Sequence, residues 1–323
     1  MRARRRPGDA GVALVVTLLA LVLIMALVWE IFHAGARAAQ SGAYGRDSIR
    51  AALLAEAGAQ AAKVILREDA KDNDFDSLND IWSLAQPPYE LGGGTIALAI
   101  EDEERKINLN NLMMPQGNAP NDQNVAVFRR LLEILAIDPS VADAVLDWLD
   151  NDESPRVGGA ESSYYLSLPY PYKSKNDLFD TLGELRLVRG VTAEVFEKLR
   201  PYVTVHSTGR VNINTAPKEV LMALSAGQGE TAMGEIDEKT ADALIASRQD
   251  KPFRSAATLK ADLAAVSPTL GNIYGTIFKS LIDVRSANFH VRATGDVAGT
   301  VRTIDSVGTR TGNVILWRYW RLE

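Results

Sequence analysis

The stretch GVALVVTLLALVLIMALVW, residues 11–29, constrains this chain more than any other part of its sequence. The eighteen residues from Val12 to Trp29 carry no charge, and Thr17 supplies their one hydroxyl. As an α-helix they are about 27 Å long, close to the thickness of a bilayer's hydrocarbon core, about 30 Å. Four basic residues before the stretch favour a cytoplasmic position for that end: Arg2, Arg4, Arg5 and Arg6. The sequence therefore predicts a membrane-crossing helix with nearly all of the chain beyond it.

Three interpretations of this stretch remain open. A cleaved secretory signal has an apolar region of about 7–15 residues and then a small-residue cleavage site, whereas this longer run leads into Trp29 and Glu30. An uncleaved signal anchor is the second interpretation. The third depends on the junction between Gly11 and Val12, where a short basic leader ends in glycine and the apolar helix starts at once. That junction resembles a type IV prepilin signal, which a membrane peptidase cuts after the glycine.

Composition limits the classes of protein that fit. A chain of 323 residues is long enough for about two domains. The absence of cysteine excludes a disulfide framework and thiolate metal sites. The net charge is −6, and removal of the leader, whose charge is +3, leaves −9. An acidic body disfavours binding to nucleic acid or to an anionic membrane surface.

The chain beyond Trp29 continues without a helix breaker. Residues 31–68 are rich in alanine and contain no proline. Apolar residues recur there at helical spacing and predict the packed face of an amphipathic helix: Ile49, Leu53, Ala57 and Val64. One helix from Val12 to about residue 68 would be about 85 Å long. An anchor helix followed by a separate surface helix is the alternative.

Strand patterns occur on both sides of a large helical segment. Residues 95–101 alternate like a strand, and we expect residues 105–109 to be their hairpin partner. The polar loop 113–124 marks a domain boundary. Strand texture returns only in three later segments: residues 288–294, 300–309 and 313–321. Terminal strands that resume an interrupted sheet imply an inserted domain.

Short helices are predicted between the two groups of strands. They are residues 125–135, 141–149, two helices within 181–203 joined by an apolar turn at 188–191, and 239–247. In the segment 211–224, Thr215 is the predicted N-cap, and Pro217 lies inside the first turn.

Five segments in sequence order carry a resemblance to one family. They are EDEERKINLNNL (101–112), DWLDNDESPRVGGAESSYY (147–165), PYKSKNDLFDTLGELRLVRG (171–190), RVNINTAPKEVL (210–221) and RQDKPF (248–253). With the leader junction, they resemble the K-type minor pseudopilins of the type II secretion system. The resemblance implies an α+β pseudopilin fold, with a long transmembrane and spine helix, an antiparallel sheet and a large inserted all-helical domain containing helix-hairpin-helix, SAM-like units. The expected divisions are a leader at 1–11, helix and first strands at 12–112, the insertion at 113–285 and terminal strands at 286–323.

The same resemblance implies a structural, non-enzymatic function. A K-type pseudopilin is expected at the tip of the periplasmic pseudopilus, where it initiates or caps assembly and supports protein export across the outer membrane. The expected location before assembly is the inner membrane, with a single pass, a cytoplasmic N-terminus and a periplasmic body. The implied partners are the I, J and H types of minor pseudopilin, the major pseudopilin, prepilin peptidase and, as candidates, exported proteins. No nucleic acid is expected.

Val16 is the fifth residue after the predicted cleavage site. Most members of the pilin class carry glutamate there, and its carboxylate meets the terminal amine of a neighbouring subunit. A subunit at the tip has no neighbour above it, so the resemblance marks Val16 as a tip-specific position. An apolar residue that faces lipid is the simpler interpretation, and the two do not conflict.

An acidic loop is the main candidate for a metal site. Counted from Asp150, the residues Asp150, Asp152, Ser154 and Glu161 occupy positions 1, 3, 5 and 12 of a calcium-loop pattern. Pro155 replaces the glycine that an EF-hand needs at position 6, so the loop is not an EF-hand. Two more carboxylates complete the candidate set: Asp147 and Glu153. The resemblance also implies calcium in the inserted domain, and solvated carboxylates remain the alternative.

Other chemical functions have weaker support. The three histidines, His33, His206 and His290, are far apart in sequence and lack zinc-ligand spacing. No nucleophile elbow or P-loop motif is present, so we expect no catalysis. Residues 182–199 resemble a helix-hairpin-helix, which makes a membrane-anchored DNA-uptake protein the alternative function. Acidic residues flank that hairpin and disfavour phosphate binding: Glu184, Glu194 and Glu197.

Overall fold

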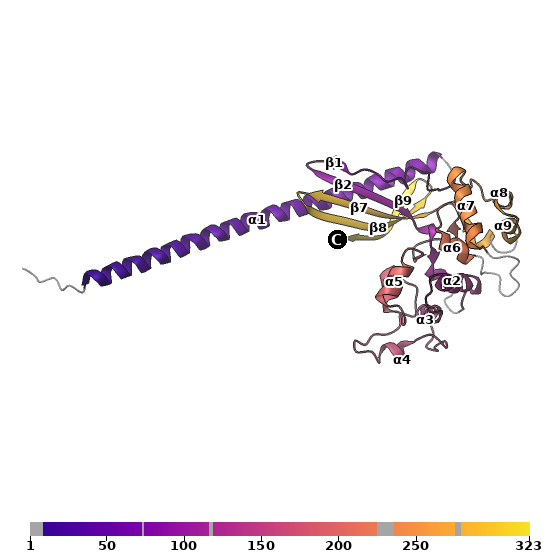
Figure 1. The fold of residues 1–323 in the computed structure, drawn as a ribbon, viewed down its shortest axis with the longest axis horizontal. Coiled ribbons are helices and arrows are strands. Elements are labelled where there is room, and N and C mark those ends of the chain that lie inside the picture. Colours follow the sequence, from indigo (N-terminus) through magenta and orange to yellow (C-terminus); the bar gives the residue numbers. More distant parts are fainter. Residues whose placement is uncertain (1–8, 73, 116–118, 225–235, 275–278) are drawn as a thin grey trace, which may run out of the picture.

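One helix extends well beyond the rest of the molecule. The computed structural model describes residues 9–72, 74–115, 119–224, 236–274 and 279–323. Helix α1 (Asp9–Asp72) is unbroken over 64 residues, which corresponds to about 96 Å. Figure 1 shows its N-terminal part projecting alone, with every other element gathered at its C-terminal end. The single continuous helix predicted from the sequence is confirmed, and the two-helix alternative is excluded.

An antiparallel sheet packs on the C-terminal part of α1. Its strand order is β1-β2-β7-β8-β9, so β2 lies beside β7 although the whole helical segment separates them in sequence. At the end of this pairing, Asp102 lies opposite Phe289. The predicted insertion into an interrupted sheet is therefore present. The strands are β1 (Tyr89–Leu91), β2 (Gly94–Asp102), β7 (Asn288–Val297), β8 (Thr300–Thr311) and β9 (Val314–Leu322).

The expected hairpin partner of β2 was wrong. β2 pairs with β1 through a turn in which Gly92 and Gly93 have positive φ, a conformation that costs glycine little. After β2 the chain enters the 3₁₀ turn η1 (Glu103–Arg105), which carries it out of the sheet. The next strand, β3 (Ile107–Asn108), instead pairs in parallel with β4 (Val203–Thr204). A five-residue apolar alternation does not by itself specify its partner.

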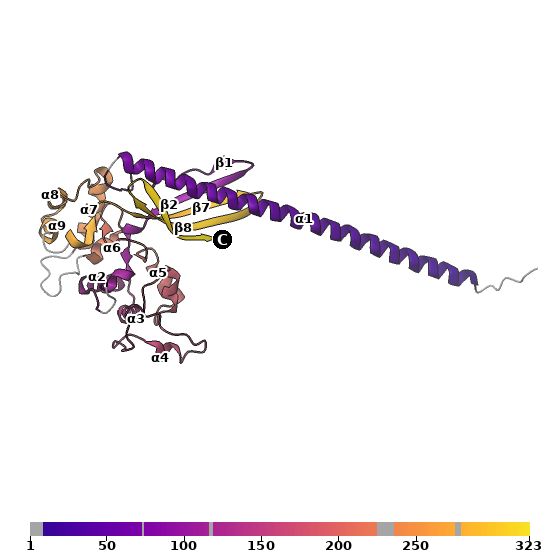
Figure 2. The same cartoon turned by 180° about the vertical axis from the view of Figure 1, so that it is seen from behind.

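Small residues bring α1 close to the sheet. Its fully buried face consists of four alanines followed by one leucine: Ala51, Ala55, Ala59, Ala62 and Leu66. A Cβ at Gly295 of β7 would lie 2.1 Å from the carbonyl oxygen of Ala51, so glycine is required at that contact. The predicted packed face was wrong, because Ile49, Leu53 and Val64 are exposed. Figures 1 and 2 show α1 lying across one face of the sheet.

The inserted block contains the largest core of buried apolar side chains. In Figure 1, α7, α8 and α9 lie beyond the C-terminal end of α1, and α2 to α5 extend to one side. Its helices are η2 (Leu109–Leu112), α2 (Asp122–Ile134), α3 (Ser140–Leu149), α4 (Ser162–Tyr165), η3 (Leu182–Leu187), α5 (Ala193–Leu199), α6 (Lys218–Ala223), α7 (Glu238–Asp250), α8 (Leu259–Val266), α9 (Pro268–Ile273) and α10 (Lys279–Leu281).

Two short parallel ladders add to the helices of the block. Besides β3–β4, strand β5 (Val211–Asn212) pairs with β6 (Ile282–Asp283). The predicted cap at Thr215 was wrong, because α6 starts later and Pro217 occupies its N-cap position. Thr215 is instead fully buried, and its hydroxyl donates a hydrogen bond to Asp102 Oδ2 at 2.5 Å. The inserted block is thus tied to the sheet through polar side chains.

Candidate functional sites: the apolar helix and the acidic loop

The first part of α1 is a membrane-crossing candidate. Among the described residues, α1 is the helix that is long and apolar enough to span a membrane, and its apolar window has no buried residue. Val16 is 59% exposed on this part of the helix. The bond between Gly11 and Val12 lies in the first turns of α1. The arginines of the predicted leader lie outside the described residues, so the processing site stays a prediction.

The acidic loop begins at the C-terminus of α3. Asp147 lies in the last turn of α3, and Asp150 is its C-cap residue. Both carboxylates are buried, and Arg156 folds back from the loop to reach them. Its Nη1 lies 2.6 Å from Asp147 Oδ1 and also contacts Asp150 Oδ2. The backbone N–H of Arg156 donates a second hydrogen bond to Asp147 Oδ2, at 3.1 Å.

Glu161 completes a cluster of three buried carboxylates. Oxygen atoms of Asp147, Asp150 and Glu161 lie within 4.8 Å of one another. Glu161 Oε2 accepts a hydrogen bond from the Ser174 hydroxyl at 3.3 Å, whereas Glu161 Oε1 and Asp150 Oδ1 are buried without a partner. Burial, reinforced by the charges of Asp147 and Asp150, raises the pKa of Glu161 to about 7. Two orphaned oxygens beside like charges are what a bound cation would satisfy.

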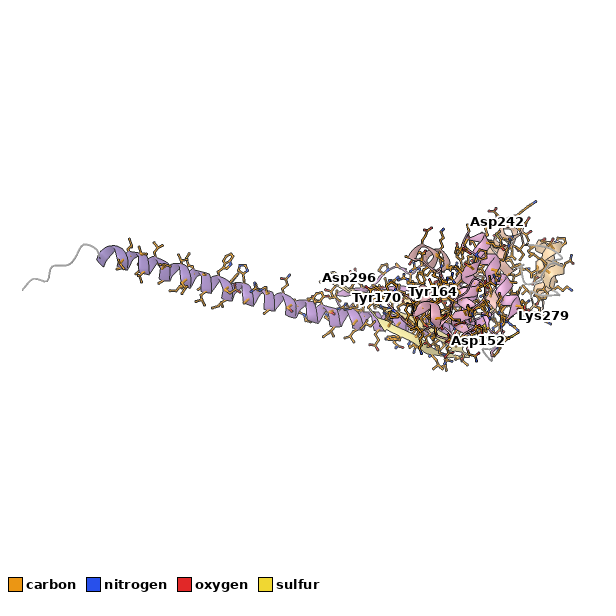
Figure 3. The ribbon with its side chains drawn as sticks, turned by 90° about the horizontal axis from the view of Figure 1, so that it is seen from below. Asp152, Tyr164, Tyr170, Asp242, Lys279 and Asp296 are labelled. Atoms are coloured by element: carbon orange, nitrogen blue, oxygen red, sulfur yellow. The ribbon has the colours of Figure 1, made fainter. Side chains whose placement is uncertain are left out.

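The other two predicted ligands lie outside this cluster. Asp152 is exposed, as Figure 3 shows at the edge of the body, and its Oδ1 accepts a hydrogen bond from the backbone N–H of Ser154 at 2.7 Å. Glu153 accepts hydrogen bonds from the hydroxyl of Ser162 at 2.9 Å and from the side-chain amide of Asn176 at 3.2 Å. Glu153 therefore fastens the loop to neighbouring segments, and Asp152 shapes its outer turn.

Sequence reasoning missed the residues that hold this loop in place. Arg156 was overlooked, although a basic residue inside a run of acids is a visible signal. Gly159 was overlooked too, and a Cβ there would lie 1.9 Å from Asp147 Oδ2. The Gly158–Gly159 pair in the printed sequence indicates such a close approach. The contribution of Ser174 had no sequence signal, because it depends on how the later loop folds back.

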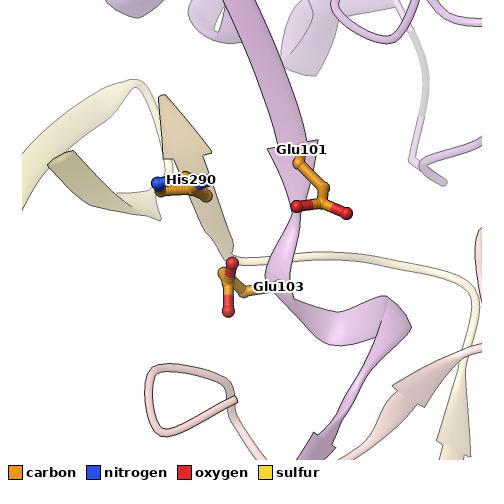
Figure 4. Close-up of side chains that lie close together, drawn as sticks. All are labelled: Glu101, Glu103 and His290. Carbon is orange, nitrogen blue, oxygen red and sulfur yellow. The ribbon is translucent and has the colours of Figure 1, made fainter. Parts of the chain in front are cut away.

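A second group of titratable side chains lies where β2 meets the inserted block. Figure 4 shows Glu101, Glu103 and His290 close together. Lys106 Nζ lies 2.9 Å from Glu101 Oε2 and 3.0 Å from Glu103 Oε1, and His290 Nε2 pairs with Asp305. The side chains of the protein already compensate these charges. The described contacts of this group are ion pairs and hydrogen bonds within the protein, and the expectation that the histidines are not zinc ligands stays a prediction.

The predicted helix-hairpin-helix forms from η3 and α5. Its apolar turn carries the buried residues Val188 and Val191. The backbone N–H of Arg189 in that turn donates to the hydroxyl of Tyr165 at 3.1 Å, and Arg189 Nη1 donates to the carbonyl of Gly159 at 2.7 Å. The turn that would offer amides to a phosphate backbone thus packs onto α4 and the acidic loop. This packing disfavours the DNA-uptake alternative.

Known sequences resemble most of the chain. Two protein-family models, both described as type II secretion system (T2SS), protein K, match residues 105–208 and 211–276 of this chain. A type II secretion system protein K of Pseudomonas aeruginosa is 29% identical over 83% of this chain and 81% of that protein. One from Klebsiella pneumoniae is 30% identical over 67% of this chain and 69% of that protein.

A solved structure shares the fold. It is the GspK-GspI-GspJ complex from the type 2 secretion system of enterotoxigenic Escherichia coli. The match has a TM-score of 0.70 and 21% identity, and it covers 89% of this chain and 99% of the matched one. A long apolar helix that continues into a spine packed on an antiparallel sheet gives this chain the pseudopilin fold, and the helical block is inserted in that sheet. The chain belongs to the protein K family of the type II secretion system, and it is a minor pseudopilin of that system.

Proposed function

We propose that this minor pseudopilin occupies the tip of the pseudopilus, where it starts or caps assembly and supports export across the outer membrane. The observation that carries the proposal is the insertion between β2 and β7. A compact block of about 180 residues has a radius of gyration of about 16 Å. Packed helices lie only about 8–10 Å apart, so a fibre built on α1 has room for such a block at its end and not at every subunit.

The exposed surface of α1 supports this position in a fibre. Val16 offers no carboxylate to a subunit above it. C-terminal to the membrane-crossing part, α1 has exposed apolar side chains on the face opposite the sheet: Tyr44, Ile49, Leu53 and Val64. They suit contacts with the helices of subunits below. A subunit that has only one of the two complementary surfaces ends a head-to-tail assembly, because no further subunit can bind on its other side.

The partners follow from this position. The I and J types of minor pseudopilin accompany the related chain in the solved complex, and we extend that association to this chain. The H type, the major pseudopilin and exported proteins are further proposed partners. The role is structural and non-catalytic, since the clustered acids serve packing or ion binding.

Processing and location are part of the same proposal. Prepilin peptidase cuts between Gly11 and Val12, and α1 holds the chain in the inner membrane with its N-terminus cytoplasmic and its body periplasmic. N-terminal sequencing of the membrane-extracted protein should give a chain that begins at Val12. An intact leader in cells with active peptidase would contradict this part of the proposal.

Calcium binding is the remaining part of the proposal. Asp147, Asp150 and Glu161 would hold the ion, and calcium takes six to eight oxygen ligands. The two orphaned oxygens of this cluster support the fit, because nothing else among the described residues satisfies them. The bound ion would supply positive charge to a loop whose acids outnumber Arg156. Asp152 and Glu153 have other contacts and would act as outer supports.

Immunogold labelling of overproduced pseudopili tests the tip position directly. The expected result is label at one end of each fibre. Label spaced along the shaft would overturn the proposal. Val16→Glu, which restores a carboxylate for a subunit above, should move part of the label away from the end, whereas the apolar exchange Val16→Leu should leave it there.

A further inference from the structure

The point where the inserted block meets the sheet is a buried cluster of carboxylates, which we call the joint. It combines the last turn of α1, the loop after α1, the end of β2, η1 and the chain that returns to β7. Each of its carboxylates is at most 6% exposed. They are Asp69, Asp76, Asp102, Glu103 and Glu104.

Asp102 connects three parts of the chain. Its Oδ2 accepts hydrogen bonds from the hydroxyl of Thr215 at 2.5 Å and from the hydroxyl of Ser286 at 2.7 Å. The amide of Asn212 lies 3.3 Å from the same oxygen and also donates to the Asp76 carbonyl at 3.0 Å. One carboxylate thus fastens the inserted block, the returning chain and the loop after α1.

Glu103 and Glu104 fasten other segments of the block. Glu103 Oε2 accepts from the hydroxyl of Thr204. Glu104 Oε1 accepts from the backbone N–H of Thr208 at 3.1 Å, and its Oε2 accepts from the backbone N–H of Asn288 at 2.9 Å. Three consecutive acids therefore hold segments of the chain that lie about a hundred or more residues away.

Arg310 of β8 holds the side of the joint nearest α1. Its Nη2 lies 2.5 and 2.6 Å from the two carboxylate oxygens of Asp76, and its Nη1 lies 3.2 Å from Asp69 Oδ2. Asp76 Oδ2 also accepts the backbone N–H of Ser286 at 2.7 Å. The end of the spine helix, the sheet and the returning chain meet at this guanidinium.

The joint contains more acid than its cations neutralise. Among the described residues, Arg310 and Lys106 are the buried cations that pair with its carboxylates. The remaining negative charge must be balanced by bound protons, since burying unpaired carboxylates is costly. Burial is the largest cause that raises the pKa of Asp102 and Glu104; the charge of Asp76 adds to it for Asp102, and that of Asp102 for Glu104. Other titratable or charged groups around the joint are Asp80, Glu101, Arg105, His206, Arg248, His290 and Asp305.

We propose that the joint is a proton-controlled hinge, which locks the inserted block onto the sheet when protonated and lets the block swing when fully ionised. Asp102 is the position that accommodates the proton, because the hydroxyls of Thr215 and Ser286 can turn to accept a hydrogen bond. Within the described part of the chain, the hydrogen-bond partners of the Glu104 carboxylate are N–H groups, which cannot accept a hydrogen bond from a protonated carboxyl. The chain segments at residues 102–107 and 284–288 are the two connections about which the block would turn. This inference goes beyond the tip position and does not depend on it.

Distance measurements between two spin labels test the hinge in the full chain in detergent. The chain has no cysteine, so Tyr170→Cys on the block and Val301→Cys on the sheet give one labelled pair. Both side chains are exposed, and Figure 3 shows Tyr170. We expect a narrow distance distribution at about pH 5.5 and a broad or shifted one at about pH 9, on either side of the titration. An identical distribution at both pH values would overturn the proposal.

Asp102→Asn isolates the responsible group. The asparagine amide mimics a protonated Asp102, so the distribution should stay narrow at both pH values. Asp242→Asn, which removes an exposed acid on α7, should behave like the parent. If the distance distribution of the Asp102→Asn variant broadens at high pH as that of the parent does, the assignment of the proton to Asp102 is wrong.

Amide exchange of the unsubstituted chain decides the question even if Asp102→Asn does not fold. The N–H groups of Thr208, Ser286 and Asn288 donate to joint carboxylates. After correction for intrinsic base catalysis, their protection should fall at least tenfold across the same pH range. Unchanged protection would overturn the hinge.

Discussion

The joint and the acidic loop are both clusters of buried carboxylates, but they differ in how far the protein supplies partners for the carboxylate oxygens. In the joint, the carboxylates of Asp76, Asp102 and Glu104 accept hydrogen bonds from several chain segments, and Arg310 supplies a rigid cation. In the loop, Asp150 and Glu161 each keep a buried oxygen without a partner. The comparison indicates that crowded carboxylates alone do not identify an ion site. The unsatisfied atoms do, because a native structure otherwise pairs its buried polar groups.

The largest expected effect is the loss of the joint's cation. Arg310→Met leaves Asp76 and Asp69 buried without their partner, and breaking such a pair costs about 3–5 kcal/mol. Chemical denaturation of the detergent-solubilised chain at neutral pH measures this. The matched control is Arg285→Met, because Arg285 pairs with Asp74 at the surface and should cost under about 1 kcal/mol. Equal losses in the two variants would contradict the role of Arg310 as the buried partner of Asp76 and Asp69.

The next largest effect is expected for calcium binding to the acidic loop. Saturating calcium, at about 100 times its Kd, should stabilise the folded chain by about 2.7 kcal/mol and raise its melting temperature. Glu161→Gln should abolish the increment, because it removes an anionic ligand. The control Glu194→Gln changes an exposed acid on α5 and should keep it. If calcium does not shift the melting temperature of the unsubstituted chain, the acidic loop does not bind calcium and does not differ from the joint in this respect.

A smaller effect is the pH dependence of calcium binding. The pKa of Glu161 is raised from 4.5 to about 7 by burial and by Asp147 and Asp150. Without calcium, ionised Glu161 destabilises the fold above pH 7, and this cost disappears as the pH falls toward 4.5. Calcium requires the ionised form, so its Kd should weaken about tenfold per pH unit below 7. Calorimetric titrations at several pH values check this, and a Kd independent of pH would exclude Glu161 as a ligand.

The smallest effect is expected at Asp152. Its carboxylate is exposed and accepts one local hydrogen bond, from the backbone of Ser154. Asp152→Asn should therefore change the free energy of unfolding by less than about 0.5 kcal/mol, and the calcium-induced shift in melting temperature should persist. Thermal scans with and without calcium measure both. Loss of the calcium shift would restore Asp152 to the ligand set predicted from the sequence.

Periodicity and composition were sufficient for the regular elements. The continuous helix, β2, the three terminal strands and most helices of the block were predicted, since each depends on local patterns. The packed face of α1 was not, because large apolar residues such as Leu53 suggested burial, whereas the close approach to Gly295 requires alanines. The partner of β2 was also missed. The pairing depends on η1, which carries the chain out of the sheet, and on β7, which lies far away in the sequence.

The candidate sites were predictable only in part. Asp147, Asp150 and Glu161 lie near one another in sequence, and the structure brings them together. The joint was invisible, because Glu104 and Asn288 are 184 residues apart and the sequence alone does not place them in contact. Thr215 shows the difference: its type and position suggested a helix cap, and tertiary structure uses it to bind Asp102.

The adjacency of β2 and β7 also determines when this protein can fold during synthesis. The strand that covers much of the alanine face of α1 lies after the entire inserted block in the chain. Until β7 leaves the ribosome, β2 lacks its central neighbour, whereas the block already has a large core of its own. Domains form as units from the N-terminal side, and pairings between distant segments form slowly. A nascent chain of this kind therefore presents an uncovered helix face for most of its synthesis.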